Sequence, residues 1–304
     1  MNHVPVLVDE VLSILSPKGG DRVIDATFGG GGHTMELLER CDCRVLGVDR
    51  DPDTTSRALQ VKSQYPDRFD FVLGKFSGLY TLLEEHGKFD GILFDFGVSS
   101  FQLDNPGRGF AFSKDGVLDM RMSKDGISAF DVINTFSESD LADIIWTYGD
   151  EPRARKIAAA IVDARKKSKI ETTATLRSIV GSVFKNQVIR KNYSNIDVAT
   201  KTFQAIRIFV NDELTEIDTA IKNLPKILND GARIAMISFH ALEDRIVKCW
   251  SKLNRDHFTP INKKVIKPHI NEIKKNPRSR SAILRGFVYN EHGKDVEDVF
   301  GKLG

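Results

Sequence analysis

Cysteine is scarce in this chain of 304 residues, and only Cys41, Cys43 and Cys249 are present. An odd number of so few thiols argues against the disulfide framework of small secreted proteins. Cys41 and Cys43 also lack nearby His or Cys partners that would complete a zinc site. We therefore expect no metal site, and a reducing, cytoplasmic location.

Long apolar runs are missing as well. No segment approaches the roughly 20 apolar residues that a membrane-spanning helix needs. The first residues include Asp9 and Glu10 where a secretory signal would be basic and then apolar. These features predict neither a membrane partner nor a targeting segment.

The chain has no large excess of charge of either sign. Its 44 Lys and Arg residues nearly balance 42 Asp and Glu, which leaves a net charge of +2 and no global field that would indicate a nucleic-acid partner. Basic residues gather locally instead, where they can contact phosphates or simply form solvated helix faces. These are Arg153, Arg155, Lys156, Arg165, Lys166, Lys167, Lys169, Lys185, Arg190 and Lys191, and a further group within 252–280.

Short apolar runs alternate with helical patterns in the first hundred residues. The runs at 22–28, 44–51, 69–76 and 89–100 predict four strands of a parallel sheet joined by right-handed crossovers. A long amphipathic helix is predicted from about 202 to 227, a fifth strand at 232–239, and a closing strand at 282–290.

The segment between these two parts has no convincing strand. It contains helix-like stretches, and the Ser and Thr residues that open 137–140 and 172–176 are typical N-caps. The pattern predicts an α/β domain formed by 1–104 and 201–304, interrupted by an all-helical insert at 105–200. With 41% hydrophobic residues, the chain is long enough for both parts.

Four consecutive glycines, 29–32, follow the first predicted strand. A glycine-rich turn at this point lies at the carboxyl edge of the sheet, where open α/β folds bind ligands, and it lets a ligand approach the main chain. A dinucleotide requires the spacing G-x-G-x-x-G, but Thr34 stands at the third glycine position. A tight turn without a ligand is the simpler alternative.

Carboxylates at successive strand ends favour a different ligand. Asp25, Asp49 and Asp95 end the first, second and fourth predicted strands. Asp49 suits the ribose of NAD or of S-adenosylmethionine equally, whereas Asp25 would repel a pyrophosphate. S-adenosylmethionine carries an ammonium and a sulfonium and no phosphate, so acids attract it. This combination favours a methyltransferase over an NAD-dependent oxidoreductase.

The chain closely resembles the bacterial 16S ribosomal RNA cytosine-N(4) methyltransferases, the RsmH or MraW family. The resemblance runs nearly end to end, in the blocks 3–12, 25–34, 47–52, 90–104, 108–122, 202–214, 237–248 and 276–285. One departure precedes 202–214, where the family usually has His-Pro-Ala-Thr-Arg and this chain has Asp197-Val198-Ala199-Thr200-Lys201.

The resemblance implies a Rossmann-like class I methyltransferase fold with S-adenosylmethionine as its cofactor. It implies cofactor contacts at Gly31, Gly32, His33, Asp49, Phe76, Asp95 and Gln102. It also implies that the helical insert recognises the substrate, a cytosine in the decoding region of 16S ribosomal RNA, within the small ribosomal subunit.

Asp95 is the candidate acceptor for the hydrogens of the target amine, with main-chain carbonyls beside it as the alternative. Candidates for substrate contact are Arg108, Phe110, Arg121 and His240, although Arg pairs with Asp and a helix cap at His240 would also explain them. A non-catalytic ribosome-binding factor stays open as a rival. Apolar residues at 11, 12, 14 and 15 suit either a core or a homodimer interface.

Overall fold

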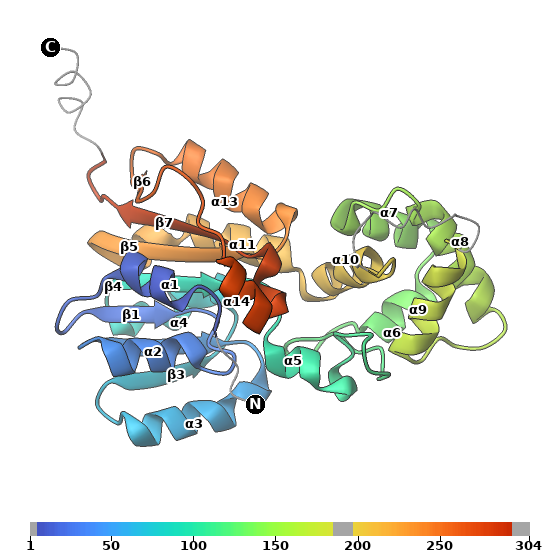
Figure 1. The fold of residues 1–304 in the computed structure, drawn as a ribbon, viewed down its shortest axis with the longest axis horizontal. Coiled ribbons are helices and arrows are strands. Elements are labelled where there is room, and N and C mark those ends of the chain that lie inside the picture. Colours follow the sequence, from blue (N-terminus) through green and yellow to red (C-terminus); the bar gives the residue numbers. More distant parts are fainter. Residues whose placement is uncertain (1–4, 185–196, 294–304) are drawn as a thin grey trace, which may run out of the picture. The chain divides into compact units, whose positions relative to one another are not determined.

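The computed structural model describes residues 5–184 and 197–293 (Figure 1). It divides into two compact units, one formed by 1–97 and 214–304 and the other by 98–213. The helical insert is therefore longer at both ends than the predicted 105–200. The reason is packing, because Val98, Phe203 and Ile206 belong to the apolar core of the second unit.

The first unit contains a seven-stranded sheet in the order β3-β2-β1-β4-β5-β7-β6. Strands β1 to β5 are parallel, β7 is antiparallel to β5, and β6 is antiparallel to β7. The strands are β1 Arg22–Asp25, β2 Arg44–Asp49, β3 Phe69–Leu73, β4 Phe89–Asp95, β5 Leu228–Ser238, β6 Phe258–Pro260 and β7 Ile283–Tyr289. The predicted parallel sheet and closing strand are confirmed.

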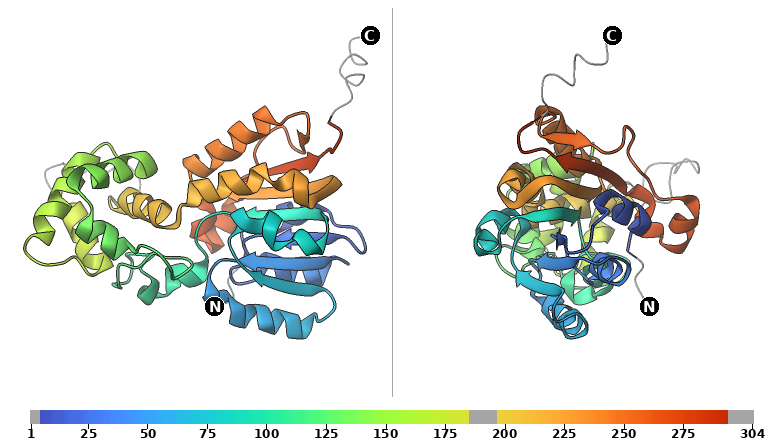
Figure 2. Two further views of the ribbon diagram at one scale, coloured as in Figure 1. Left: turned by 180° about the vertical axis from the view of Figure 1, so that it is seen from behind. Right: turned by 90° about the vertical axis from the view of Figure 1, so that its left-hand side faces the viewer.

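Helices lie on both faces of this sheet (Figure 2). Successive strand residues point to opposite faces, so Val23 joins the core beneath α1, α2 and α3, whereas Ile24 joins the core beneath α4, α11 and α13. The helices are α1 Val8–Leu15, α2 Gly32–Arg40, α3 Thr55–Gln64, α4 Leu79–Leu82, α11 Glu213–Lys222, α12 Leu224–Ile227, α13 Ala241–Leu253 and α14 Ile270–Lys275. Short 3-10 turns are η1 Pro52–Thr54, η2 Phe76–Gly78, η3 Glu84–His86 and η5 Pro277–Ser281.

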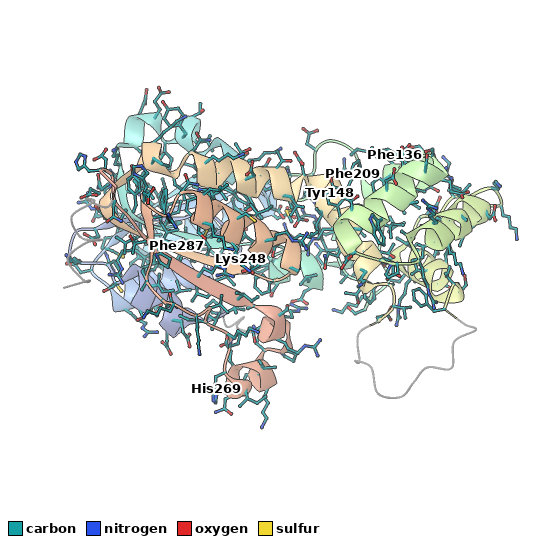
Figure 3. All side chains as sticks on the ribbon, turned by 90° about the horizontal axis from the view of Figure 1, so that it is seen from above. Phe136, Tyr148, Phe209, Lys248, His269 and Phe287 are labelled. Atoms are coloured by element: carbon teal, nitrogen blue, oxygen red, sulfur yellow. The ribbon has the colours of Figure 1, made fainter. Side chains whose placement is uncertain are left out.

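The second unit is helical. It contains α5 Ser100–Asp104, the 3-10 turn η4 Pro106–Arg108, α6 Ala129–Thr135, α7 Glu138–Gly149, α8 Ala154–Arg165, α9 Thr173–Ser182 and α10 Thr200–Asn211. The predicted caps are confirmed, since Ser137 accepts from Asp140 N–H and Thr172 from Thr175 N–H. Phe209 packs edge-on to Phe136 and close to Tyr148 in its core (Figure 3).

Two local predictions are wrong. The long helix expected over 202–227 is three helices. Asp212 adopts a left-handed conformation (φ 51°) that ends α10, and α12 begins at Leu224 after the N-cap Asn223, with Pro225 in its first turn. Strand β5 begins at Leu228 rather than at residue 232. A register shift against β4, between Phe89 and Gly91, accommodates the turn-like residues Asn229 to Gly231.

Among the residues that the structure describes, no helix is both long enough and apolar enough to cross a membrane. Of the residues left open between core and dimer interface, Val11, Ile14 and Leu15 are buried in the core of the first unit, and Leu12 packs against it.

Candidate functional site

The glycine turn connects β1 to α2 in backbone conformations that favour glycine. Gly29 and Gly31 have φ values of 50° and 71°. A Cβ atom on Gly31 would lie only 2.8 Å from Cζ of Phe28. Any side chain at Gly31 would therefore push Phe28 out of the core. The backbone of the turn is partly exposed at Gly30 and Gly32, where a ligand can approach it.

Asp25, at the end of β1, forms hydrogen bonds with residues on both sides of the glycine turn. The side chain is 1% exposed, accepts a hydrogen bond from Thr34 Oγ1 at 2.7 Å, and accepts another from Thr27 N–H at 3.3 Å. Burial raises its pKa, while the nearby His33 lowers it. Since both oxygens bond within the turn, Asp25 fixes the turn and adds negative potential to it.

Asp49 ties the end of β2 to the same turn. Its carboxylate accepts the N–H of Gly29 at 2.7 Å and the N–H of Asp51 at 2.8 Å. Burial raises the pKa of Asp49 to about 6, against the lowering effect of these two amide hydrogen bonds. Asp49 is thus a partly desolvated acceptor beside the glycine backbone.

Asp95 ends β4 next to the turn. Its N–H donates to Thr27 Oγ1 at 2.7 Å, and its Oδ2 lies 3.8 Å from Nδ1 of His33. Its Oδ1 is buried and has no hydrogen-bond partner. Burial raises the pKa of Asp95 to about 6; His33 opposes this, and the negative charges of Asp25 and Glu243 add to it. A buried, unsatisfied carboxylate oxygen costs stability, as is common at ligand sites.

Phe76 begins η2 directly after β3. Its ring is partly buried and lies edge-on to Phe94, with centroids 5.9 Å apart and an interplanar angle of 83°. Phe96 is 6.1 Å away. The structure therefore places the predicted residues Gly31, Gly32, His33, Asp49, Phe76 and Asp95 in the first unit, at or next to the carboxyl ends of β1 to β4.

Gln102 belongs to the second unit. It is buried on α5, and its Oε1 accepts the N–H of Ser99 at 2.9 Å as half of a capping box. This contact explains the local helix start; its role toward a cofactor stays a prediction.

Of the two roles left open for His240, the structure shows the helix cap. Its Nδ1 accepts the N–H of Glu243 at the start of α13, and its Nε2 lies 3.0 Å from Oε1 of that residue. Glu243 is completely buried, and its Oε2 accepts the N–H of Phe239 at 2.7 Å. Sequence reasoning missed Glu243, although the spacing of His240 and Glu243 matches a capping box.

The other substrate candidates have structural partners inside the second unit. Arg121 forms a two-pronged ion pair with Asp119, with distances of 3.1 and 2.7 Å. Arg108 is buried and donates to the carbonyls of Arg121 and Met122, and Phe110 is part of the core. Substrate contact by these three residues stays a prediction. The predicted phosphate contacts Lys185, Arg190 and Lys191 lie outside the described residues.

The site fits S-adenosylmethionine on two observations. Three acids, Asp25, Asp49 and Asp95, lie at the ends of β1, β2 and β4 and favour a cation. The unpartnered Oδ1 of Asp95 offers an acceptor, and the partly exposed backbone at Gly30 and Gly32 allows a close approach. The third-glycine position of a dinucleotide site is occupied by Thr34, whose hydroxyl is bonded to Asp25.

Comparison with known proteins agrees with this geometry. The chain matches the MraW methylase family over residues 1–289. It is 47% identical over 303 residues to ribosomal RNA small subunit methyltransferase H of Rickettsia bellii (strain OSU 85-389), covering 93% of this chain and 97% of the relative. The same enzyme of Anaplasma phagocytophilum (strain HZ) is 47% identical over 297 residues, at 95% and 99% coverage.

Among solved structures, an rRNA methylase from Streptococcus thermophilus superposes with a TM-score of 0.43 at 12% identity, covering 93% of each chain. This similarity is low, and the sequence relatives show the family of the chain. The chain therefore belongs to the MraW methylase family and is a methyltransferase with S-adenosylmethionine as its cofactor.

Proposed function

We propose that this protein methylates the exocyclic N(4) amine of a cytosine in the decoding region of 16S ribosomal RNA, within the small ribosomal subunit. The relatives at 47% identity are named as ribosomal RNA small subunit methyltransferases, which supports the class of substrate. The choice of atom and region rests on the resemblance of blocks such as 90–104 and 237–248 to the cytosine-N(4) enzymes.

The observation that carries the proposal is the state of Asp95. Its Oδ1 is buried without a partner at the end of β4, beside the turn that would hold the cofactor. The exocyclic amine of cytosine is a poor nucleophile, because its lone pair is delocalised into the ring. A fixed acceptor that binds the amine hydrogens orients the amine and lets the lone pair rehybridise, an advantage of positioning worth several kcal/mol.

S-adenosylmethionine supplies an electrophilic methyl group on a sulfonium. In our proposal the bare backbone at Gly31 and Gly32 lets the cofactor approach the turn, and Asp49 accepts hydrogen bonds from ribose hydroxyls. Phe76 offers an aromatic surface to the adenine. The carboxylate of Asp95 supplies negative charge that stabilises the positive charge of the cofactor, and His33 adds a contact from the start of α2. Gln102 is proposed to add a contact from α5.

The helical unit, 98–213, is the proposed substrate-binding part. A base must leave its stack before its amine can reach the active site, so the unit has to bind RNA around a splayed nucleotide. The basic residues at both ends of α8, including Arg155, Lys156 and Lys166, are exposed or partly exposed and suit phosphate contacts. Arg108, Phe110 and Arg121 are proposed to lie near the entrance. A homodimer is a further prediction.

Two rivals make different predictions. An NAD-dependent oxidoreductase would bind NADH, but a pyrophosphate would meet the negative potential of Asp25, Asp49 and Asp95. A non-catalytic ribosome-binding factor would bind the small subunit without transferring a methyl group. Calorimetry with S-adenosylmethionine and with NADH separates the first rival from our proposal.

The decisive assay uses radiolabelled S-adenosylmethionine with purified small ribosomal subunits and with naked 16S RNA from a strain that lacks the enzyme. We expect one methyl group per RNA, located by mass spectrometry on a cytosine of the decoding region as N(4)-methylcytosine. Transfer to another base or to a ring carbon would overturn the proposed specificity. Binding to the subunit without any transfer would favour the non-catalytic factor.

A further inference from the structure

Residues Pro5 to Leu7, here called the strap, lie against the glycine turn. A Cβ atom on Gly32 would be 3.1 Å from Cβ of Pro5, so the proline packs directly on the turn. Val6 and Leu7 are 4% and 1% exposed. The strap is therefore part of the wall around the turn, although it precedes the turn by more than 20 residues in sequence.

Two side chains hold the strap from different sides. Nε2 of His33, at the start of α2, donates to the carbonyl oxygen of Val6 at 2.9 Å. Oε1 of Glu272, on α14, accepts the N–H of Leu7 at 2.9 Å. The second contact joins residues 265 positions apart in the chain. One polar group from the turn and one from the C-terminal part thus fix three residues of backbone.

The backbone of the strap needs such anchors. Leu7 has φ 56° and ψ 37°, a left-handed conformation that is unfavourable for a residue with a branched side chain. It also begins α1 without a side-chain cap. The hydrogen bond from Leu7 N–H to a carboxylate is of the stronger, charge-assisted kind and compensates for this cost.

Glu272 is an acidic residue within a basic stretch of the chain. It is the only acid between residues 257 and 290, a stretch that contains the basic residues Lys263, Lys264, Lys267, Lys274, Lys275, Arg278, Arg280 and Arg285. A carboxylate weakens the attraction of such a stretch for phosphates. An acid in the first turn of α14 favours that helix through its dipole, but the helix has only 6 residues. The hydrogen bond from Leu7 N–H gives this carboxylate a specific structural role.

We propose that Glu272 is a positioning residue for the cofactor site. It fixes Leu7, the strap fixes the ring of His33 through Val6, and the ring in turn faces Oδ2 of Asp95 at 3.8 Å. The cofactor turn is thereby tied to α14 in the basic C-terminal stretch. This inference rests on the proposed function only in its consequence for cofactor binding; the fastening of the strap is a property of the protein alone.

The first test therefore uses the protein without cofactor. Amide hydrogen exchange is measured for Glu272→Ala, Glu272→Gln and wild type, with Glu291→Gln as the control. Glu291 is an exposed carboxylate of the same unit that pairs with Lys88 at 2.9 Å. We expect exchange at Leu7 and at Gly31 to accelerate at least tenfold in Glu272→Ala, less in Glu272→Gln, and not in the control. Exchange within β4 should not change. Unchanged exchange at Leu7 and Gly31 in both Glu272 variants would overturn the proposal.

The second test measures binding of S-adenosylhomocysteine by calorimetry, with the thermal unfolding midpoint as a check of folding. We expect about tenfold weaker binding in Glu272→Ala together with a small decrease of the midpoint from the lost bond to Leu7. A purely structural role would lower the midpoint and leave binding intact. Faster exchange with wild-type affinity would overturn the link to the cofactor. If wild type itself binds no S-adenosylhomocysteine, the proposed function fails, whereas the exchange result still decides whether Glu272 fastens the strap.

Discussion

Asp95→Asn isolates the charge of one carboxylate in the proposed cofactor site. The substitution keeps the size of the side chain and removes the negative charge next to the glycine turn. S-adenosylmethionine carries a sulfonium, whereas S-adenosylhomocysteine lacks the transferred methyl group, has a neutral thioether and is otherwise alike. The ratio of their affinities therefore reports the attraction between the site and the sulfonium.

Coulomb's law gives the magnitude for a chosen separation. A carboxylate about 6 Å from a cation contributes about 3 kcal/mol at an effective dielectric constant of about 20. Asp95 is 26% exposed, and solvent screening reduces this to about 1 to 2 kcal/mol, or about five- to thirtyfold in affinity. Since burial raises the pKa of Asp95 to about 6, the ionised fraction falls about tenfold between pH 8 and pH 5. Wild type should lose its preference for the sulfonium over this range.

Calorimetric titration of both ligands at pH 5, 6, 7 and 8 tests this reasoning. In Asp95→Asn the ratio should be about tenfold lower at pH 8 and should change less with pH than in wild type, the remaining change coming from Asp49, whose pKa is also raised to about 6. Asp70→Asn is the matched control, since Asp70 is a 72% exposed carboxylate that pairs with Lys62 on the same unit. An Asp95→Asn protein that keeps both the wild-type ratio and its pH dependence would refute the assignment of Asp95 as the charge that attracts the sulfonium.

Three further predictions concern stability. Because the pKa of Asp95 is raised from 3.8 to about 6, the folded state binds the proton more tightly than the unfolded state, and stability falls as pH rises from about 4 to about 6. Asp95→Asn should therefore raise the free energy of unfolding, measured in urea at pH 7, by about 1 kcal/mol. A loss of stability at pH 7 would contradict this. Gly31→Ala should cost about 2 kcal/mol and weaken binding of S-adenosylhomocysteine, because the added Cβ meets Phe28 at 2.8 Å and φ is 71°; a thermally unchanged variant would argue against the strained turn. Ser137→Ala removes the N-cap of α7 and should lower the free energy of unfolding by about 1 kcal/mol, as measured by denaturation. Calorimetry should show no change in ligand affinity. Weakened binding would show that the helical unit influences the ligand site.

Local patterns in the sequence predicted most of the sheet, because each buried strand is a short apolar run whose alternate residues serve the two faces. They also predicted that Asp25, Asp49 and Asp95 end neighbouring strands, since the carboxyl ends of parallel strands meet at one edge. Ser137 and Thr172 were predictable as N-caps because a cap depends on only three or four residues of chain.

Other features depend on contacts that no local pattern contains. The break at Asp212 falls inside a continuous apolar repeat, and packing decides that α10 joins the helical unit while α11 joins the sheet. From the sequence, His240 suited a cap or a ligand site equally. In the structure its Nδ1 accepts the hydrogen bond from Glu243 N–H, which is the cap. The bond between Leu7 and Glu272 spans 265 positions, and neither residue indicates the other in the sequence.

The sequence by itself determined the parallel sheet, the glycine turn, the acids at the strand ends and the family to which the chain belongs. All of these follow from patterns of residues close together in the sequence, or from the sequence blocks that resemble the family. For the three acids at the strand ends, the tertiary structure alone decided which carboxylate oxygens accept hydrogen bonds within the fold and that Asp95 Oδ1 is buried without a partner. The reason is physical: burial and hydrogen-bond partners are set by segments far apart in the chain, and these set the pKa and charge of each acid.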